Sequence, residues 1–248
     1  MKRIASLIAV VALMTIFGAA QAFAQSSGNF SATGTGASCK IGDGGTLSGG
    51  TTTTVFSSNI STSNGSGVTL NIRPSLVTGL FTDTKISTTV PTTSADIGIE
   101  VCVTVDGSGA GILPTNCAVY DQRFQQISSN LFSQLSECTA APTTTACTTD
   151  ADCTVLGTGF TCDPTALVCV GPNPLCDFDL ILSTLSAHSF DFVVPVSKGK
   201  PHVVQATWRV VGAGASNASA HVASCVGPGI VTVTQYKVFN NSGALLTF

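Results

Sequence analysis

The nine residues IGIEVCVTV, at positions 97–105, decide the fold class of this chain. Every second residue from Ile97 to Val105 is a β-branched apolar residue, and Gly, Glu, Cys and Thr stand between them. A period of two is typical of a strand with one face on a core and the other face in contact with solvent. The stretch therefore predicts a half-buried β-strand.

The residues that follow this strand predict its partner. Cys102 lies on the polar face of the strand, and after the turn DGSGAG at 106–111 the run ILPTNCAVY at 112–120 brings Cys117 back opposite it. Facing β-carbons of an antiparallel pair lie about 4.5–5.5 Å apart, which a disulfide can bridge. We therefore expect a hairpin with a Cys102–Cys117 disulfide.

Similar strand patterns recur along the chain, at GVTLNIRP (67–74), LVTGLFT (76–82), DLILSTLS (179–186) and IVTVTQYKVF (230–239). A second hairpin is expected within 187–211. Its apolar faces coincide when Phe190 stands opposite Trp208, which leaves the five-residue loop SKGKP at 197–201.

One segment, DQRFQQISSNLFSQLSE at 121–137, has apolar residues at helical spacing: Phe124, Ile127, Leu131 and Leu135. It predicts an amphipathic helix with Asp121 near its N-cap. Many short strands with Gly-rich turns and a single helix favour an all-β fold. We expect an antiparallel β-sandwich, of the jelly-roll or immunoglobulin-like type.

The N-terminus has the pattern of a secretory signal. Lys2 and Arg3 precede an apolar run, and the small-residue motif AFA stands directly before Gln25. We expect residues 1–24 to be removed near Ala24–Gln25, giving a secreted protein, extracellular or periplasmic. No later apolar run reaches the roughly 18 residues of a spanning helix, so no membrane span is expected after cleavage.

The rest of the chain divides by composition. Residues 25–65 are rich in Ser, Thr and Gly and are expected to form a flexible or surface-laid N-terminal strand region. Residues 66–138 and 176–248 carry the strand patterns of the sandwich. Residues 139–175 between them are expected to form a cysteine-rich insert.

The insert does not have the spacing of a metal or redox site. Cys147, Cys153, Cys162 and Cys169 are separated by five, eight and six residues. Zinc sites built from cysteine use pairs two to four residues apart, and redox sites use C-x-x-C. An even number of cysteines, ten in this exported chain, is typical of a disulfide framework. No metal ligand and no cofactor-binding residue is predicted.

The stretch CTTDADCTVLGTGFTCDPTALVC, at 147–169, resembles the small cysteine-rich modules typified by the Dickkopf N-terminal region, which also occur in secreted bacterial proteins. The resemblance covers about 23 of the 248 residues and omits the further cysteines of the full Dickkopf region. It implies a small disulfide-bonded module, and we infer no signalling activity from it.

The expected disulfides follow from the arrangement of strands and insert. We pair Cys138 with Cys176 at the base of the insert and keep Cys147, Cys153, Cys162 and Cys169 among themselves, without choosing between their pairings. With Cys102 joined to Cys117, the remaining pair is Cys39 with Cys225.

Two pairs of aspartates invite a calcium interpretation. Asp150 and Asp152 begin like an EF-hand loop, but Val155 stands where that loop needs Gly and Thr161 where it needs Glu. Capping of a turn is the favoured role. Asp177 and Asp179 share one face of a strand, and a solvated edge is favoured for them over calcium binding.

Charge and motifs exclude several functions. The chain has 10 basic and 13 acidic residues with no basic cluster, so nucleic-acid binding is not expected. The hydrolase motifs G-x-S-x-G and H-E-x-x-H and the phosphate loop are absent. In the expected second hairpin His188 and His202 lie roughly 27 Å apart, too far to act together. No catalytic residue is predicted.

The preferred hypothesis is a secreted, non-enzymatic structural or interaction protein of the cell exterior, which self-associates or binds a cell-surface protein or glycan. The alternative is a monomeric carbohydrate- or protein-binding module. The only tryptophan, Trp208, lies on the expected core face, which disfavours a sugar platform. A secreted hydrolase is a third, weaker hypothesis, because sandwich folds support many activities.

Overall fold

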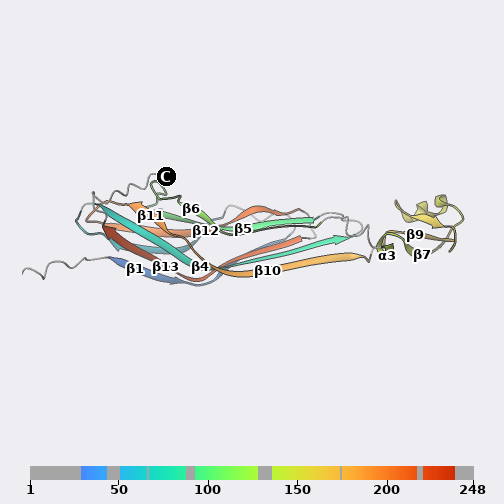
Figure 1. Cartoon of the computed structure of the whole chain (residues 1–248), viewed down its shortest axis with the longest axis horizontal. Coiled ribbons are helices and arrows are strands. Elements are labelled where there is room, and N and C mark those ends of the chain that lie inside the picture. Colours follow the sequence, from blue (N-terminus) through green and yellow to red (C-terminus); the bar gives the residue numbers. More distant parts are fainter. Residues whose placement is uncertain are drawn as a thin grey trace, which may run out of the picture.

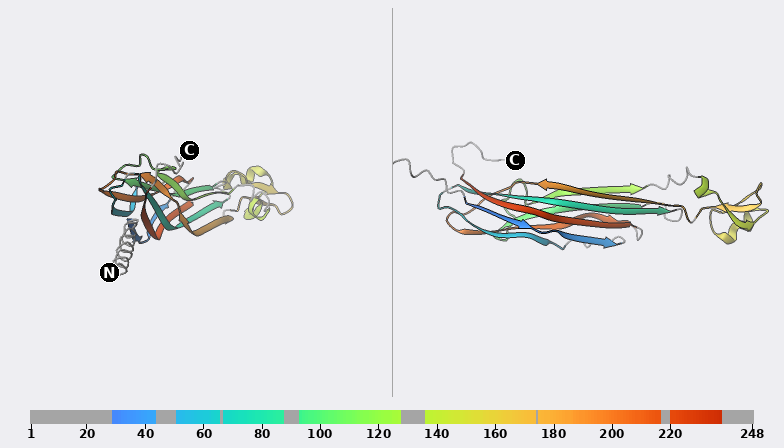
Figure 2. Two further views of the ribbon diagram at one scale, coloured as in Figure 1. Left: turned by 60° about the vertical axis from the view of Figure 1, so that its left-hand side comes forward. Right: turned by 90° about the horizontal axis from the view of Figure 1, so that it is seen from below.

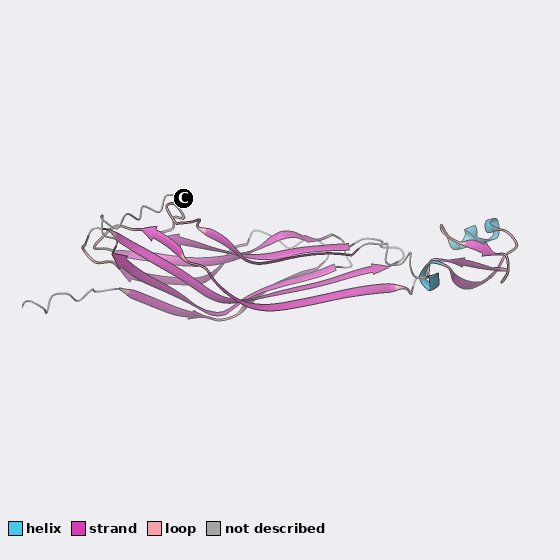
Figure 3. Cartoon of the chain, in the orientation of Figure 1, coloured by secondary structure: helices cyan, strands magenta, loops and turns pink. Residues whose placement is uncertain are grey.

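Antiparallel strands make up most of the molecule (Figure 3). The computed structural model describes residues 29–43, 51–65, 67–87, 93–127, 136–173, 175–216 and 220–237. The predicted signal peptide at 1–24 lies outside these residues. The predicted all-β class with antiparallel sheets is confirmed.

One sheet, called sheet A below, has the order β1-β13-β4-β10. The short strands β2 and β11 extend its two margins, because β2 pairs with β13 beside β1 and β11 pairs with β4 beside β10. Its strands are β1 (Phe30–Thr35), β2 (Ser38–Asp43), β4 (Val68–Ser87), β10 (Asp177–Ser189), β11 (Phe192–Pro195) and β13 (Ala220–Lys237).

The facing sheet, sheet B, has the order β3-β12-β5-β6. Its strands are β3 (Thr53–Ser61), β5 (Thr93–Val105), β6 (Cys117–Ile127) and β12 (Pro201–Ala215). When β1 with β2 and β10 with β11 are each taken as one interrupted strand, the described residues form an eight-stranded sandwich. The first strand then lies beside the last and the second beside the seventh, which is the jelly-roll arrangement.

The core lies between the two sheets and follows from the period of two. In β4 every second side chain is buried over twenty residues, because the even-numbered positions face sheet B. The stretch that decides the fold class is part of β5, whose burial alternates as expected from Ile99 to Val105, with Val101 and Val103 fully buried, while Gly98 is buried as well. Large side chains that fill the core include Trp208, Phe192, Leu70, Ile72 and Ile99.

The inward face of β4 becomes polar toward the end that adjoins the insert. Thr82 donates its hydroxyl to Oε1 of Gln125, at 2.7 Å, and Thr78 donates to Asp121 at 3.1 Å. Gln125 in turn donates from Nε2 to the carbonyl oxygen of Leu180, at 3.0 Å. Because buried polar groups are costly unless bonded, these contacts allow threonines to lie inside a sandwich.

The predicted hairpin with Phe190 opposite Trp208 is wrong. β11 pairs with β4 in sheet A, where Phe192 stands opposite Ile72, whereas β12 lies in sheet B, where Trp208 stands opposite Val101. The loop at 196–200 crosses from one sheet to the other. Two strands with one apolar face each can pair side by side in one sheet or face each other across a core. β11 and β12 face each other across the core.

The predicted helix at 121–137 is wrong over its first seven residues, because β6 continues to Ile127. Residues three apart fall on opposite faces of a strand, so Phe124 is 66% exposed whereas Ile127 is buried. Pairing with β5, such as Phe124 with Asp96, overrides the local helical spacing. Residues 128–135 lie outside the described residues, and a short helix, α3 (Ser136–Thr139), follows them.

The segment 25–65, expected to be flexible or surface-laid, contributes β1, β2 and β3 to the two sheets. β1 also contacts β3 across the sandwich margin, where the hydroxyls of Ser31 and Ser58 are 2.7 Å apart. In the described parts of this segment, 29–43 and 51–65, most of the small polar residues belong to edge strands of the two sheets.

The insert forms a separate small sheet with the order β7-β9-β8, called the cysteine module below. Its elements are β7 (Ala141–Ala146), the 3-10 helix η2 (Asp150–Leu156), β8 (Thr161–Asp163) and β9 (Val168–Gly171). Figures 1 and 2 show the module beyond one end of the elongated sandwich. Among the described helices, none has the length and apolar character needed to cross a membrane.

Candidate functional site

Five disulfides join the ten cysteines of the chain. Cys39 is bonded to Cys225, Cys102 to Cys117, and Cys138 to Cys176, which are the pairs expected from the sequence. Within the cysteine module the structure makes the choice that the sequence left open, since it joins Cys147 to Cys162 and Cys153 to Cys169.

The closest groupings of potential metal ligands in the described residues are built on these disulfides. One consists of Cys147, Cys153 and Cys169, and the other of Glu100, Cys102 and Cys117. A metal-binding cysteine supplies a thiolate, whereas each sulfur here is bonded to another sulfur. These cysteines therefore crosslink the fold.

The aspartates of the cysteine module cap its turns. Asp152 accepts hydrogen bonds from the backbone N–H groups of Thr148 and Thr149, each at 2.9 Å. These bonds, that from Thr148 first, lower the pKa of Asp152 below its usual value. Asp150 accepts from the backbone N–H of Cys162 at 2.8 Å. The carboxylates thus hold the loops in the way that the sequence interpretation favoured.

Asp177 and Asp179 lie at the start of β10, the outermost strand of that margin of sheet A. Both face Lys85 of β4: the ammonium group contacts Asp177 directly and lies 3.9 Å from Asp179. The hydrogen bond to Asp177 is the first cause that raises the pKa of Lys85. These exposed ion pairs show that Asp177 and Asp179 lie at a solvated strand edge, as the sequence interpretation favoured.

A buried histidine and an aspartate form a pair at the far end of the sandwich. The Nδ1 atom of His202 is 2.8 Å from Asp106, and its Nε2 atom is 2.8 Å from the carbonyl oxygen of Ser197. Because Nε2 faces a backbone carbonyl, the pair has no hydroxyl to activate as a nucleophile. It fastens the loop before β12 to the turn after β5.

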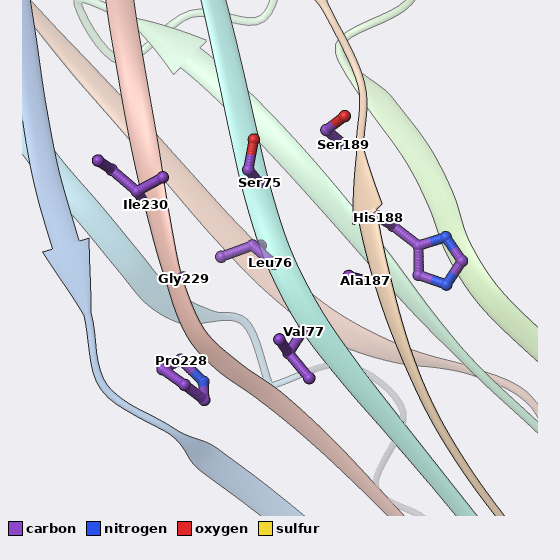
Figure 4. Close-up of a pocket in the computed structure, with 9 residues that line it drawn as sticks. All are labelled: Ser75, Leu76, Val77, Ala187, His188, Ser189, Pro228, Gly229 and Ile230. Atoms are coloured by element: carbon purple, nitrogen blue, oxygen red, sulfur yellow. The ribbon is translucent and has the colours of Figure 1, made fainter.

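A hollow of about 320 Å³ lies where β13 bulges away from β4. Ser75, Val77, Ile230 and Pro228 contribute to its wall, and Figure 4 shows the ring of His188 turned away from them. That ring contacts Tyr120 of the opposite sheet edge-on, with ring centres 6.4 Å apart. The hollow carries no Asp, Glu, Lys or Arg in its wall, so it offers a ligand few directional contacts.

The feature that distinguishes the surface is the edge strand β10. It pairs with β4 over its full thirteen residues, and no described strand pairs with its other side. On the outward face Ile181 is 58% and Leu185 79% exposed. On the inward face Phe178 is 39% and Leu182 40% exposed, because sheet B covers this margin only in part.

The outer strands of the two sheets contact each other at both margins of the sandwich. On the β1 side, Asn29 contacts the backbone of β3 in addition to the Ser31–Ser58 bond, so the two sheets meet. On the β10 side, Gln125 of β6 donates to the carbonyl oxygen of Leu180 and the ring of Tyr120 contacts that of His188, but Ile181 and Leu185 on the outward face stay exposed. A long apolar edge strand with an open side is a template for pairing with another chain.

The sequence indicated a strand at 179–186 and a solvated edge at Asp177 and Asp179, but not the exposure of Ile181 and Leu185. The pattern LILSTLS carries apolar residues of both parities, at Leu180, Ile181, Leu182 and Leu185. In a soluble sandwich this pattern is typical of a strand buried on both faces, which β10 is not. The signal that could have revealed the exposure is that this apolar pattern directly follows Asp177 and Asp179, two charged residues that do not fit a strand buried on both faces.

No protein-family model and no curated protein matches this sequence. The resemblance of 147–169 to Dickkopf-type modules therefore stays a prediction. Among solved structures, two of infectious bursal disease virus, the Gx and Gt strains, match at 10% identity. The matches cover 84% and 85% of this chain but 39% and 42% of the viral chains, with a TM-score of 0.16 in both cases. At that score they support no argument on fold or function.

Proposed function

We propose that this chain is a secreted, non-enzymatic structural protein of the cell exterior that self-associates through the free edge of β10. The observation that carries the proposal is the thirteen-residue edge strand with large apolar side chains exposed on both faces. Monomeric proteins usually protect such an edge by charges, bulges or a covering segment, because it otherwise recruits another strand.

The disulfides support the exterior location. Five disulfides are typical of proteins of oxidising compartments, where such bonds form and persist. Two of them join neighbouring strands of the sandwich, Cys39 to Cys225 and Cys102 to Cys117, so the strand ladders themselves are crosslinked. This construction suits a structural protein outside the cell.

The candidate chemical groups support a structural role as well. His202 and Asp106 are both engaged in holding loops, and the aspartates of the cysteine module accept backbone hydrogen bonds. Trp208 is buried in the core, so it is not a platform for a sugar ring. The strongest remaining surface feature is therefore the edge of β10.

The test is the native mass of the mature, oxidised chain, measured by light scattering after size exclusion over a range of concentrations. The chain is expected to associate as its concentration rises. The double variant Ile181→Lys/Leu185→Lys is expected to weaken association by about tenfold or more, because it places charge on the pairing edge.

The matched control is Val119→Lys/Ile230→Lys, which adds the same charge at exposed apolar positions of β6 and β13. This control is expected to associate like the unmodified chain. A compact monomer at every concentration would refute self-association and would direct attention to glycans and surface proteins as ligands.

A further inference from the structure

We infer that two copies of this chain pair through β10 in antiparallel fashion, around a two-fold axis at Ser183, so that sheet A continues from one copy into the other. This inference rests on the proposed self-association and adds the partner strand and the register. It is derived from the face, the length and the exposed residues of β10.

The faces of the strand restrict the register first. Odd-numbered residues of β10, such as Ile181 and Leu185, lie on the outward face of sheet A, and even-numbered residues lie on the inward face. In a continuous sheet, residues that stand opposite each other share a face. For two identical strands the numbers of opposite residues must therefore add to an even value, which places the axis at a residue.

The length of the strand and its apolar residues select one register. With the axis at Ser183, opposite residues add to 366, and the whole strand is paired from Asp177 opposite Ser189 onward. Ile181 of each copy then stands opposite Leu185 of the other, so the four most exposed apolar side chains of the outward face form one cluster.

In neighbouring registers Ile181 no longer stands opposite Leu185. An axis at Leu182 or at Thr184 leaves two residues of each strand unpaired and sets Ile181 opposite Ser183 or Ala187. In the register centred on Ser183, Asp179 stands opposite Ala187, so no carboxylate faces another carboxylate.

Among the described residues, the unpaired edge on this margin of sheet A ends with β10. Beyond β10 the edge is already occupied, because Leu113 forms a backbone bridge with Val193 of β11.

The experiment is crosslinking of Ser183→Cys in the full mature chain. All ten native cysteines are in disulfides, so the new thiol is the sole free one. Opposite residues of an antiparallel pair have Cα atoms about 4.5–5.5 Å apart, within the range of a disulfide. Oxidation is expected to give a covalent dimer on a non-reducing gel, at concentrations where light scattering shows association.

The matched control is Ser189→Cys, on the same face of the same strand. In the inferred register the two copies of residue 189 lie roughly 40 Å apart, so no dimer is expected. Crosslinking of Ser189→Cys, or of Thr184→Cys in place of Ser183→Cys, would overturn the register.

The two proposals fail in different ways. If the unmodified chain associates but Ser183→Cys does not crosslink, the two-fold pairing is wrong while self-association stands. If the unmodified chain remains a monomer and Ser183→Cys gives no dimer, the proposed function is wrong as well.

Discussion

The sandwich and the cysteine module keep their shapes by different means. The sandwich buries large side chains such as Trp208, Phe192 and Leu70 between two sheets. The buried centre of the module consists of Cys147, Cys153 and Cys169, with Phe160 packed beside them. A segment of this length cannot bury enough apolar surface to fold alone, so covalent crosslinks take the place of a core. Substitutions that remove one kind of support should therefore act on one region and spare the other.

The largest effect is expected from Phe192→Ala. Phe192 is fully buried in the core cluster with Leu70 and Val204, and loss of a core phenylalanine costs about 3–5 kcal/mol. Trp208 is the only tryptophan and lies in the core, so its fluorescence in urea reports the unfolding of the sandwich. Resistance of the module to protease under native conditions should not change. An equal loss of both signals would mean that the two regions unfold as one unit.

The double variant Cys153→Ser/Cys169→Ser should do the reverse. It opens a crosslink that spans 16 residues, for which the loop-entropy model gives about 3 kcal/mol. The module is expected to become sensitive to protease within 141–171, while the Trp208 unfolding midpoint stays the same. The matched control is Cys102→Ser/Cys117→Ser, which spans 15 residues in the sandwich and should lower that midpoint.

A smaller effect is expected from acid. Hydrogen bonds from the backbone of Thr148 and Thr149 lower the pKa of Asp152, so its stabilisation of the module is present above the ordinary carboxyl pKa. That stabilisation is lost as the pH falls below about 4, through the lowered pKa. Protease sensitivity of the module, measured with an acid-active protease, should rise over this range.

The variant Asp152→Asn should raise protease sensitivity at neutral pH and flatten its dependence on acid. Asp83→Asn, on the outward face of β4, provides the control and should leave the pH profile of the module unchanged. A profile that Asp152→Asn does not alter would show that another group governs the acid response.

The sequence predicted those parts of the fold that depend on neighbouring residues. The alternation at 97–105 and the return to Cys117 are local, and the hairpin of β5 and β6 has Cys102 opposite Cys117 as expected. Parity shows which face of a strand is apolar but not which strand lies beside it. For that reason the pattern within 187–211 predicts one hairpin, whereas β11 and β12 lie in different sheets.

The sequence alone could not predict the candidate site, because the site depends on contacts between residues far apart in the chain. Residues 121–127 have helical spacing, and only their pairing with β5 makes them a strand. The exposure of Phe178 and Leu182 depends on how far sheet B extends beneath β10, and that of Ile181 and Leu185 on whether any segment covers the outward face of sheet A. Both are properties of the assembled sandwich. The sequence therefore located the strand and its acidic end, and the structure revealed the open apolar edge.

The base of the cysteine module has a consequence for the ways in which this scaffold can be changed. The Cα atoms of Cys138 and Cys176, the two ends of the insertion, are only 5.6 Å apart. That spacing is close to the Cα separation of opposite residues in an antiparallel pair, about 5.5 Å, so the two ends of the insert lie side by side. The module can therefore be exchanged. A short turn, or a foreign domain whose termini lie close together, can join the same two positions and leave the jelly roll and its β10 edge unchanged.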